Sequence, residues 1–160
     1  MNKFITSVIS TIAALQMTPD KVRVKLLRLI GWKIGSNTAI SYGVFSSASD
    51  VTIGNNVYIG PHAYLDAHGG IAIGDFVRIG SHLKMLTRSH PIGEGDIRAN
   101  HGDDVDVHTS IGHGSWIAAN VTILPGANVA DSCIIGAGAV VTKPTKNRGK
   151  YFGVPARQVA

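Results

Sequence analysis

The chain has 160 residues, a formal net charge of +5 at pH 7, 19 glycines and only 6% aromatic residues. This length is enough for one domain with a substantial core. A basic chain can bind nucleic acid, but no stacking aromatics and no nucleic-acid motif accompany the basic residues here, which argues against that class. The single cysteine, Cys133, excludes a disulfide framework within the chain and fits a reducing compartment, so we expect a cytoplasmic protein.

Residues 1–17 carry apolar side chains at helical spacing, with serine and threonine opposite them. The apolar stripe consists of Phe4, Ile5, Val8, Ile9, Ile12 and Leu15. The segment has no convincing signal-peptide cleavage site, and it is too short and too polar to span a bilayer. We therefore predict an amphipathic helix that docks on the body of the protein.

A second helix is predicted to begin at Thr18-Pro19-Asp20, with Thr18 as the N-cap and Pro19 in the first helical position, and to end near Gly31. Its apolar face contains Val22, Leu26, Leu27, Leu29 and Ile30, and its basic face contains Lys21, Arg23, Lys25 and Arg28. In the favoured interpretation, the helices cap the open end of the body and cover its strand edges. A compatible alternative is that the basic face contacts anionic lipid, which would make the protein peripheral at the inner face of the membrane.

Residues 111–141 repeat with a period of six. An aliphatic residue opens each hexapeptide, and a second small or branched residue follows four positions later. The first set is Ile111, Ile117, Ile123, Val129, Ile135 and Val141, and the second is Ser115, Val121, Ala127, Cys133, Ala139 and Thr145. Neither a helix nor a plain strand has this period. Glycine, asparagine and aspartate between the apolar positions are typical of a parallel β-helix, in which Cys133 would point into the core.

The repeat begins at Ile34, slips by one residue before Ile53, and contains two extra residues around His68. We expect about five coils, the first of them irregular. Residues 87–109 contain no usable hexapeptide and are predicted to form a loop that projects from the β-helix, where function often concentrates.

After Val141 the period ends in a basic tail that could hold a phosphorylated ligand, and Tyr151-Phe152 is expected to fold back on the last coil. The predicted organisation is mainly β within one structural domain, with a helical cap at 1–33, a β-helix at 34–146 and a tail at 147–160.

Five motifs follow one another in a characteristic order. They are Ser-His-Pro (89–91), Gly-Ser-Trp-Ile-Ala-Ala-Asn (114–120), Ile-Leu-Pro-Gly (123–126), Ile-Gly-Ala-Gly-Ala-Val-Val-Thr-Lys (135–143) and Gly-Val-Pro-Ala-Arg (153–157). Over roughly residues 31 to 160 the chain resembles the hexapeptide-repeat acyltransferases, especially the galactoside, maltose and polysaccharide O-acetyltransferases. The resemblance implies left-handed triangular coils and a homotrimer with active sites between subunits. It also implies acetyl transfer from acetyl-CoA to a hydroxyl of a sugar, glycan or polysaccharide precursor.

The resemblance assigns His90 as the general base, and the chemistry agrees, because a neutral imidazole can take the proton of a hydroxyl as it attacks a thioester. The positions that match the family's cofactor contacts are Trp116, Ala119 and Ala137 for the pantetheine groove, and Thr142, Lys143 and Arg157 for the nucleotide and its phosphates. Lysine and arginine both suit phosphate.

Asp66, His68 and Arg98 are candidate acceptor contacts, and Asp66 is alternatively expected to hold His90 in the right tautomer. An asparagine that helps to hold the acceptor in the sugar acetyltransferases is replaced by Gly60 in this chain. This difference favours a glycan or polysaccharide precursor over a simple galactoside or maltose.

Three alternatives remain open. One is N-acetylation of an amino sugar, and another is a purely structural β-helix. The third is a zinc enzyme resembling the γ-class carbonic anhydrases, because His62, His68 and His82 occupy outward corners, His62 and His82 are expected to stack, and His108 and His113 form another close pair. The three-histidine spacing of that class does not occur in the chain, so we expect no metal.

Overall fold

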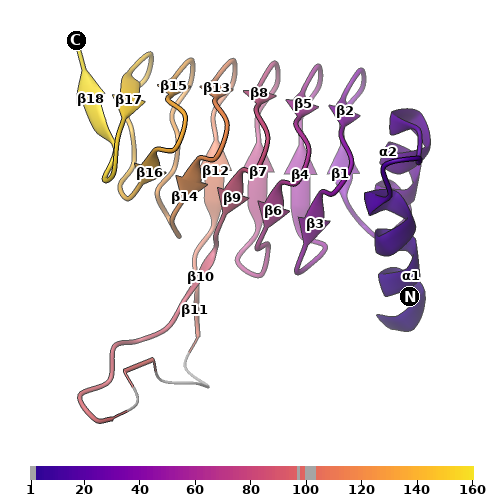
Figure 1. Cartoon of the computed structure of the whole chain (residues 1–160), viewed down its shortest axis with the longest axis horizontal. Coiled ribbons are helices and arrows are strands. Elements are labelled where there is room, and N and C mark those ends of the chain that lie inside the picture. Colours follow the sequence, from indigo (N-terminus) through magenta and orange to yellow (C-terminus); the bar gives the residue numbers. More distant parts are fainter. Residues whose placement is uncertain (1–2, 97, 100–103) are drawn as a thin grey trace.

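The computed structural model describes residues 3–96, 98–99 and 104–160. The chain forms a parallel β-solenoid with two helices at one end and a long loop that projects from one side (Figure 1). None of the described helices is long and apolar enough to cross a membrane.

Three sheets form the walls of the solenoid. Sheet A contains β1 (Lys33–Ile34), β4 (Val51–Ile53), β7 (Ile71–Ile73) and β12 (Thr109–Ile111). Sheet B contains β2 (Ala39–Ile40), β5 (Tyr58–Ile59), β8 (Arg78–Ile79), β13 (Trp116–Ile117), β15 (Ile134–Ile135), β17 (Lys150–Phe152) and β18 (Arg157–Val159). Sheet C contains β3 (Phe45–Ser46), β6 (Tyr64–Leu65), β9 (Lys84–Met85), β14 (Thr122–Ile123) and β16 (Val140–Val141).

The predicted β-helix is therefore confirmed, with about six turns rather than five. Within the described residues, all strands of sheet B are parallel except β18, which pairs antiparallel with β17 at the C-terminal end. The additional turn comes from the segment after residue 146, which was expected to leave the repeat. β17 pairs in parallel with β15, so the tail extends the solenoid before β18 closes its edge.

The first residue of each hexapeptide lies in the core, as its period predicts. In sheet B the strand register places Ile40, Ile59, Ile79, Ile117 and Ile135 in one buried column. Burying each such side chain stabilises the fold by about 1.5–3 kcal/mol. The column ends at Tyr151, whose hydroxyl accepts a hydrogen bond from the Lys146 amide at 2.8 Å. Cys133 is fully buried, so its predicted place in the core is confirmed.

Two columns of turns connect the sheets on either side of sheet C. The B–C corner comprises residues 41–44, 60–63, 80–83, 118–121 and 136–139, between sheets B and C. The C–A corner comprises residues 47–50, 66–70, 86–108, 124–128 and 142–145, between sheets C and A. At the B–C corner His62 and His82 both have a φ of +60°, and their rings stack with centroids 5.0 Å apart. The predicted stacking of these two histidines is confirmed.

Helix α1 (Lys3–Ala14) packs against α2 (Asp20–Leu29), and its Ala14 carbonyl accepts a hydrogen bond from the Gly43 amide of the first coil at 2.8 Å. The predicted amphipathic helix is confirmed, but most of its apolar stripe does not face the body of the protein. Ala13 is buried and Ile9 half-buried, whereas the rest of the apolar stripe faces solvent. The reason is that Val24, Leu27 and Ile30 of the second helical segment already cover the end of the solenoid.

Helix α2 also differs from its prediction. Pro19 is the N-cap and Asp20 the first helical residue, because the Thr18 hydroxyl bonds to the Ile12 carbonyl at 2.6 Å instead of capping α2. Arg23, expected on an exposed basic face, has only 1% of its surface exposed. Its guanidinium donates to the carbonyls of Ala13, Leu15, Thr18 and Ile40 and to the carboxylate of Asp20. Arg23 thus joins both helices to the first coil.

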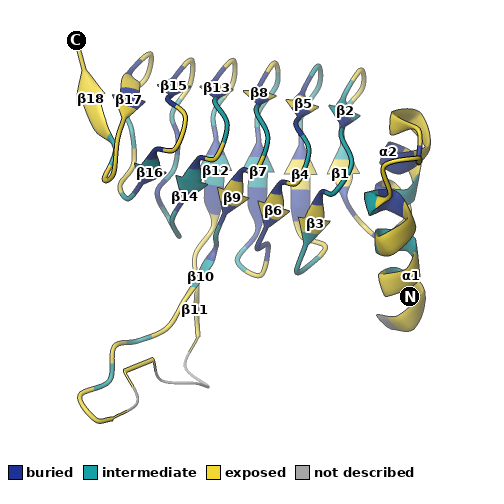
Figure 2. Ribbon diagram, viewed as in Figure 1, coloured by how far each residue is buried: buried dark blue, intermediate teal, exposed yellow. Residues whose placement is uncertain are grey.

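The loop between β9 and β12 leaves the body as an antiparallel ribbon of β10 (Arg88–Ser89) and β11 (Val105–Asp106). Figure 2 shows buried and intermediate residues in the strands of the solenoid, with mostly exposed residues on the ribbon and on the helices. The predicted projecting loop is confirmed, and its root lies at the C–A corner.

Candidate active site

The root of the loop holds a cluster of charged side chains around His90. Arg88 forms a two-pronged ion pair with Asp106, with Nε to Oδ1 at 2.7 Å and Nη2 to Oδ2 at 3.0 Å. Its Nη1 lies 3.3 Å from the Oδ2 of Asp104. The other carboxylate oxygen of Asp104 lies 2.7 Å from the Nδ1 of His90. The antiparallel β10–β11 pairing brings these four side chains together.

The contacts in this cluster favour the charged forms of Arg88 and Asp106 and one tautomer of His90. The hydrogen bond from Arg88 holds the pKa of Asp106 below its usual value, and the same bond raises the pKa of Arg88. A carboxylate beside Nδ1 favours the tautomer of His90 that carries its proton there, which puts the lone pair of the neutral ring on Nε2. This arrangement suits a general base.

A second cluster lies one coil closer to the helices, at the same corner. Asp66 Oδ1 is 2.6 Å from the Nδ1 of His68 and 2.7 Å from the hydroxyl of Ser47. Burial alone would raise the pKa of Asp66, but the hydrogen bonds from His68 and Ser47 outweigh it and lower the pKa. The expectation that Asp66 holds His90 differs from this geometry, because Asp104 occupies that place at the Nδ1 of His90.

Arg98 lies away from both clusters. It belongs to the outer part of the loop, where its carbonyl accepts a hydrogen bond from Gly93 at 2.9 Å and its side chain is exposed. An acceptor contact by Arg98 would therefore require the acceptor, or a neighbouring molecule, to reach the outer part of the loop.

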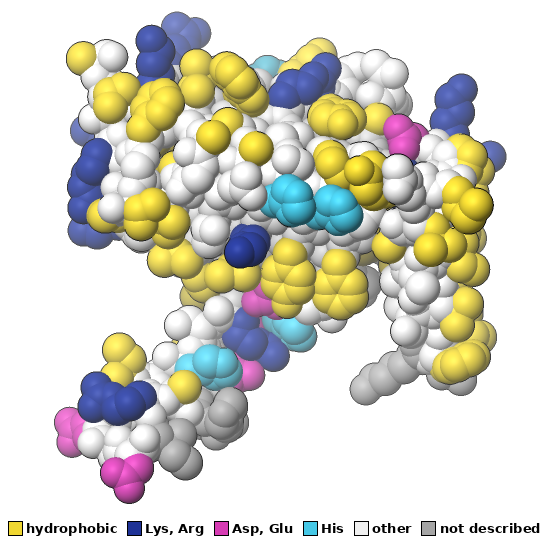
Figure 3. All heavy atoms as spheres, in the orientation of Figure 1, with side chains coloured by type: hydrophobic (Ala, Val, Ile, Leu, Met, Phe, Trp, Pro, Cys, Tyr) yellow, Lys and Arg dark blue, Asp and Glu magenta, His cyan; other side chains and the backbone are white. Residues whose placement is uncertain are grey.

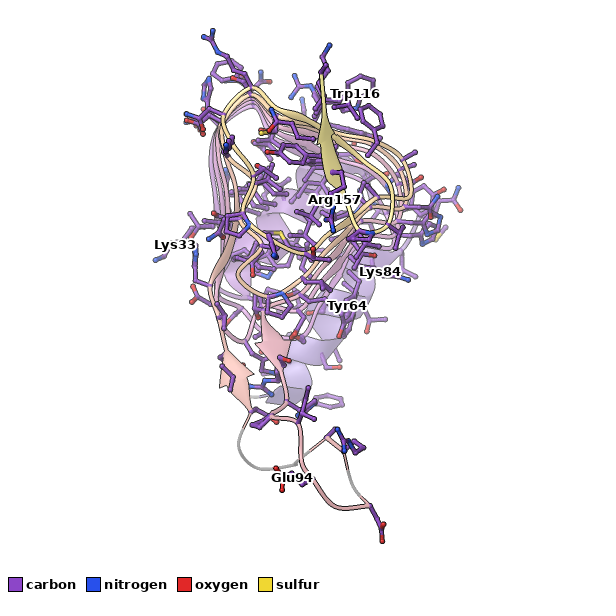
Figure 4. The ribbon with its side chains drawn as sticks, turned by 90° about the vertical axis from the view of Figure 1, so that its left-hand side faces the viewer. Lys33, Tyr64, Lys84, Glu94, Trp116 and Arg157 are labelled. Atoms are coloured by element: carbon purple, nitrogen blue, oxygen red, sulfur yellow. The ribbon has the colours of Figure 1, made fainter. Side chains whose placement is uncertain are left out.

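Trp116, Ala119 and Ala137 lie together around the B–C corner. Trp116 is on the outer face of sheet B with 56% of its surface exposed. Ala119 and Ala137 occupy successive turns, linked by a hydrogen bond from the Gly138 amide to the Ala119 carbonyl at 2.9 Å. Figure 4, viewed along the solenoid from its C-terminal end, shows Trp116 pointing outward on one side of this corner and Tyr64 and Lys84 on the other. Ala119 is half-buried and Ala137 exposed, and we call the surface formed by these small turn residues the shelf.

The residues of the predicted phosphate site lie at two different corners of the solenoid. Arg157 pairs with Phe152, whose ring lies against Gly136 beside the Ala137 turn, so Arg157 belongs to the B–C side. Thr142 and Lys143 follow β16 and lie at the C–A corner. Sheet C stands between the corners, and the five residue steps from Ala137 to Thr142 span at most about 17 Å at 3.3 Å per residue.

Gly60 has a structural reason to be glycine. A β-carbon at this position would lie 2.6 Å from the carbonyl carbon of Gly80 in the next coil, so an asparagine would require a backbone shift. The acceptor contact that the resemblance leads one to look for at this position is therefore sterically excluded by the present backbone.

Sequence reasoning missed Arg88, Asp104 and Asp106. The sequence does hold a signal for them. Arg88 and His90 are two positions apart near the start of the segment that interrupts the repeat, and Asp104 and Asp106 are two positions apart near its end. Alternate residues of paired strands share a face, so an antiparallel ribbon would have placed these charges together.

Among the described residues, no group of three or more histidine, cysteine, aspartate or glutamate side chains is arranged to hold a metal ion. The stacked rings of His62 and His82 form a pair that also contacts Tyr42. The ring of His113 packs edge-on against Phe76 at 5.4 Å, which differs from the expected pairing with His108.

Two family models match the chain. Residues 108–143 match the bacterial transferase hexapeptide (six repeats), and residues 50–81 match the hexapeptide repeat of succinyl-transferase. Galactoside O-acetyltransferase of Escherichia coli K12 is 30% identical over 138 residues, which cover 86% of this chain and 67% of the relative. The galactoside O-acetyltransferase of Lactococcus lactis is 27% identical, with 87% and 67% covered. The chain belongs to the hexapeptide-repeat acetyltransferase family and is an acyltransferase.

Solved structures share the whole fold. A hexapeptide-repeat acetyltransferase of Vibrio cholerae, solved with acetyl coenzyme A, superposes with a TM-score of 0.80 at 20% identity and covers 99% of this chain and 85% of its own. A maltose O-acetyltransferase of Clostridium difficile gives a TM-score of 0.73 at 23% identity, with 98% and 83% covered. These likenesses extend to the helical cap and the tail.

Proposed function

We propose that this protein transfers the acetyl group of acetyl-CoA to a hydroxyl of a sugar, glycan or polysaccharide precursor, with His90 as the general base. The observation that carries the proposal is the contact between the Nδ1 of His90 and the Oδ1 of Asp104 at 2.7 Å, at the root of the loop in a chain of this acetyltransferase family.

In the proposed reaction, the Nε2 of His90 takes the proton of the acceptor hydroxyl as its oxygen attacks the thioester carbonyl carbon. The carbon–sulfur bond then breaks, and the thiolate of CoA leaves with the proton that His90 returns. The carboxylate of Asp104 stabilises the imidazolium between the two proton transfers. Base catalysis of this kind contributes roughly 100- to 10,000-fold to the rate.

On the donor side, the shelf formed by Ala119 and Ala137 would take the pantetheine arm, with Trp116 beside it. Thr142, Lys143 and Arg157 would contact the nucleotide and its phosphates. The support is that small turn residues permit a close approach, that Lys143 and Arg157 are exposed, and that the Vibrio cholerae protein of the same fold was solved with acetyl coenzyme A.

We also propose a homotrimer in which each site lies between two copies. His90, Thr142 and Lys143 lie at the C–A corner of one chain, whereas Trp116, Ala119 and Ala137 lie around its B–C corner. A neighbouring copy that sets its B–C corner against the C–A corner would complete the site. The proposed location is the cytoplasm, in keeping with a single buried free cysteine among the described residues.

The acceptor is proposed to contact Asp66 and His68, whose cluster adjoins the loop root, and to reach Arg98 on the loop. Gly60 stands where the sugar acetyltransferases that the chain resembles have an asparagine that helps to hold the acceptor. The loss of this contact favours a glycan or polysaccharide precursor over a simple sugar. N-acetylation of an amino sugar is the second candidate, since the N-acyltransferase AntD of Bacillus cereus shares the fold with a TM-score of 0.68 at 22% identity.

The test combines a transfer screen with a binding measurement. Acetyl-CoA is offered with sugars, oligosaccharides, nucleotide sugars and amino sugars, and transfer is followed by release of free thiol. His90→Ala is expected to abolish transfer, while acetyl-CoA still raises its melting temperature as in the unaltered protein. Lys143→Ala is expected to weaken that thermal shift.

His68→Ala is the matched control, because His68 also pairs with a carboxylate but lies one coil away. It is expected to weaken acceptor use and to leave residual transfer. If His90→Ala retains transfer and His68→Ala does not, the assignment of the base is wrong. If acetyl-CoA leaves the melting temperature of the unaltered protein unchanged at saturation, the donor is wrong.

A further inference from the structure

The helical cap turns an apolar face to solvent. The five outward residues of α1 and the segment after it are Phe4, Ile5, Val8, Ile12 and Leu15, each more than two fifths exposed, and Phe4 reaches 73%. The inward side of α1 holds Ala13 together with the half-buried Ile9, Thr6 and Ser10. A helix that only capped the solenoid would show the opposite arrangement, with its apolar stripe inward.

Helix α2 continues this surface with a mixed face. Val22 and Leu29 are exposed, at 45% and 67%. Lys21 and Lys25 are also exposed, at the edge of α2 that borders residues 35–39 of the first coil. Figure 3 shows apolar side chains along the outer edge of the cap, with lysine and arginine side chains at the same end of the molecule. We call these nine residues the cap surface: Phe4, Ile5, Val8, Ile12, Leu15, Lys21, Val22, Lys25 and Leu29.

The net charge of the chain comes from this end. Residues 1–33 contain six lysines and arginines and one acidic residue, Asp20, which leaves +5, the formal net charge of the whole chain. Residues 34–160 contain nine basic and nine acidic residues and are therefore neutral overall. Two copies that met end to end through the cap surface would bring like charges together, which disfavours a second copy as the occupant.

We propose that the cap surface docks on an anionic lipid bilayer. An amphipathic helix lying in the interfacial plane buries its apolar side among the headgroups and acyl chains, and neighbouring lysines attract anionic lipid. The stripe of α1 supplies the apolar part, and Lys21 and Lys25 supply the charge. The solenoid would then stand on the membrane by its N-terminal end, with the candidate site along its side.

The experiment measures sedimentation of the full chain with sucrose-loaded vesicles. One set is phosphatidylcholine alone, and the other is equal parts of phosphatidylcholine and phosphatidylglycerol. Binding to the anionic vesicles is expected to exceed binding to the neutral ones and to fall with added salt. Lys21→Ala with Lys25→Ala is expected to weaken anionic binding by about fivefold per charge. Val8→Asp, which places a charge within the stripe, is expected to remove it.

Matched controls come from the far end of the solenoid. Val159→Ser removes an exposed apolar side chain, and Lys146→Ala with Lys150→Ala removes two exposed charges; both are expected to bind vesicles like the unaltered chain. The thermal shift with acetyl-CoA should be unchanged in every cap variant, which separates this proposal from the proposed function. Equal binding to the two vesicle types, or equal loss in the controls, would overturn it. So would a Val8→Asp variant that binds vesicles normally but has a smaller oligomeric mass.

Discussion

The two corners that flank sheet C follow the same repeat but carry opposite chemistry. The B–C corner consists of tight turns with small residues and stacked rings, and every turn has the same length. The C–A corner accepts insertions and collects charge: Asp66, His68 and the ribbon that holds His90 all belong to it. A hexapeptide repeat fixes the inward residues and leaves the corners free, so one rigid scaffold can present a smooth shelf on one edge and an ionised cluster on the other.

The largest effect is expected from separating the corners onto different chains. His90→Ala disables the C–A corner, and Ala137→Trp fills the shelf at the B–C corner; each alone should lose roughly 100-fold or more of the transfer rate. When the two variants are mixed during assembly of the proposed trimer, a site made of one intact corner from each is expected to be restored. With random assortment about a quarter of the sites should regain activity.

The control for this mixing is each variant assembled with itself and then combined without exchange of subunits, which should stay inactive. Activity that does not rise after subunit exchange would place both halves of the site on one chain. Full activity of Ala137→Trp alone would remove the B–C corner from the site.

A smaller effect is expected within the C–A corner, from Asp104→Asn. The amide can donate to the Nδ1 of His90 and favour the wrong tautomer, so the rate should fall by at least about tenfold while acetyl-CoA affinity is unchanged. Asp106→Asn is the matched variant, since Asp106 pairs with Arg88, which in turn contacts Asp104. The comparison is made on kcat and on the pH profile of kcat/KM. A larger loss in Asp106→Asn than in Asp104→Asn would contradict the assigned role of Asp104.

The smallest effect concerns the stability of the C–A corner at low pH. The hydrogen bonds of Asp66 lower its pKa in the folded state. Its carboxylate therefore contributes stability that is complete above the unfolded pKa of about 3.9 and is lost as the pH falls through the lower folded value. Asp66→Asn should be less stable than the parent chain at neutral pH, by about 1 kcal/mol.

This difference should shrink as the pH approaches 3, measured by urea unfolding at several pH values. Asp96→Asn, an exposed carboxylate on the loop, serves as the control and should track the parent chain throughout. A gap between Asp66→Asn and the parent that widens in acid would mean that the protonated carboxyl, not the carboxylate, is the stabilising form.

The solenoid followed from the sequence because its period is a direct property of the chain. Positions such as Ile117 and Ile135 must be buried and in register once each coil stacks on the last. The presence of both helices could also be predicted from the sequence, but the direction in which α1 turns its apolar stripe could not. The outward stripe of α1 depends on Leu27 and Val24 covering the end coil first, which is a tertiary competition that a single helix pattern does not reveal.

The candidate site could be predicted from the sequence only in part. His90 lies where the repeat breaks, and this position in the sequence predicts a functional role for it. The pairing of Asp104 with it depends on how the two arms of the loop return to each other, and no local pattern fixes that register. Arg23 shows a further limit, because a basic residue on a helix is ordinarily solvated, and only the four carbonyls that converge on it explain its burial.

The stacking of the coils has a metric consequence. Neighbouring strands are about 4.7–4.9 Å apart, so each coil adds that length along the axis of the solenoid. Under the proposed function, the loop that carries His90 leaves one coil before Ala119 and two before Ala137, and the basic residues of the tail lie at the far end. The scaffold then acts as a ruler that matches the length of the donor. Inserting one further coil of three hexapeptides between Ala119 and Ala137 would move the phosphate contacts by one strand spacing. The donor would then need a longer pantetheine arm.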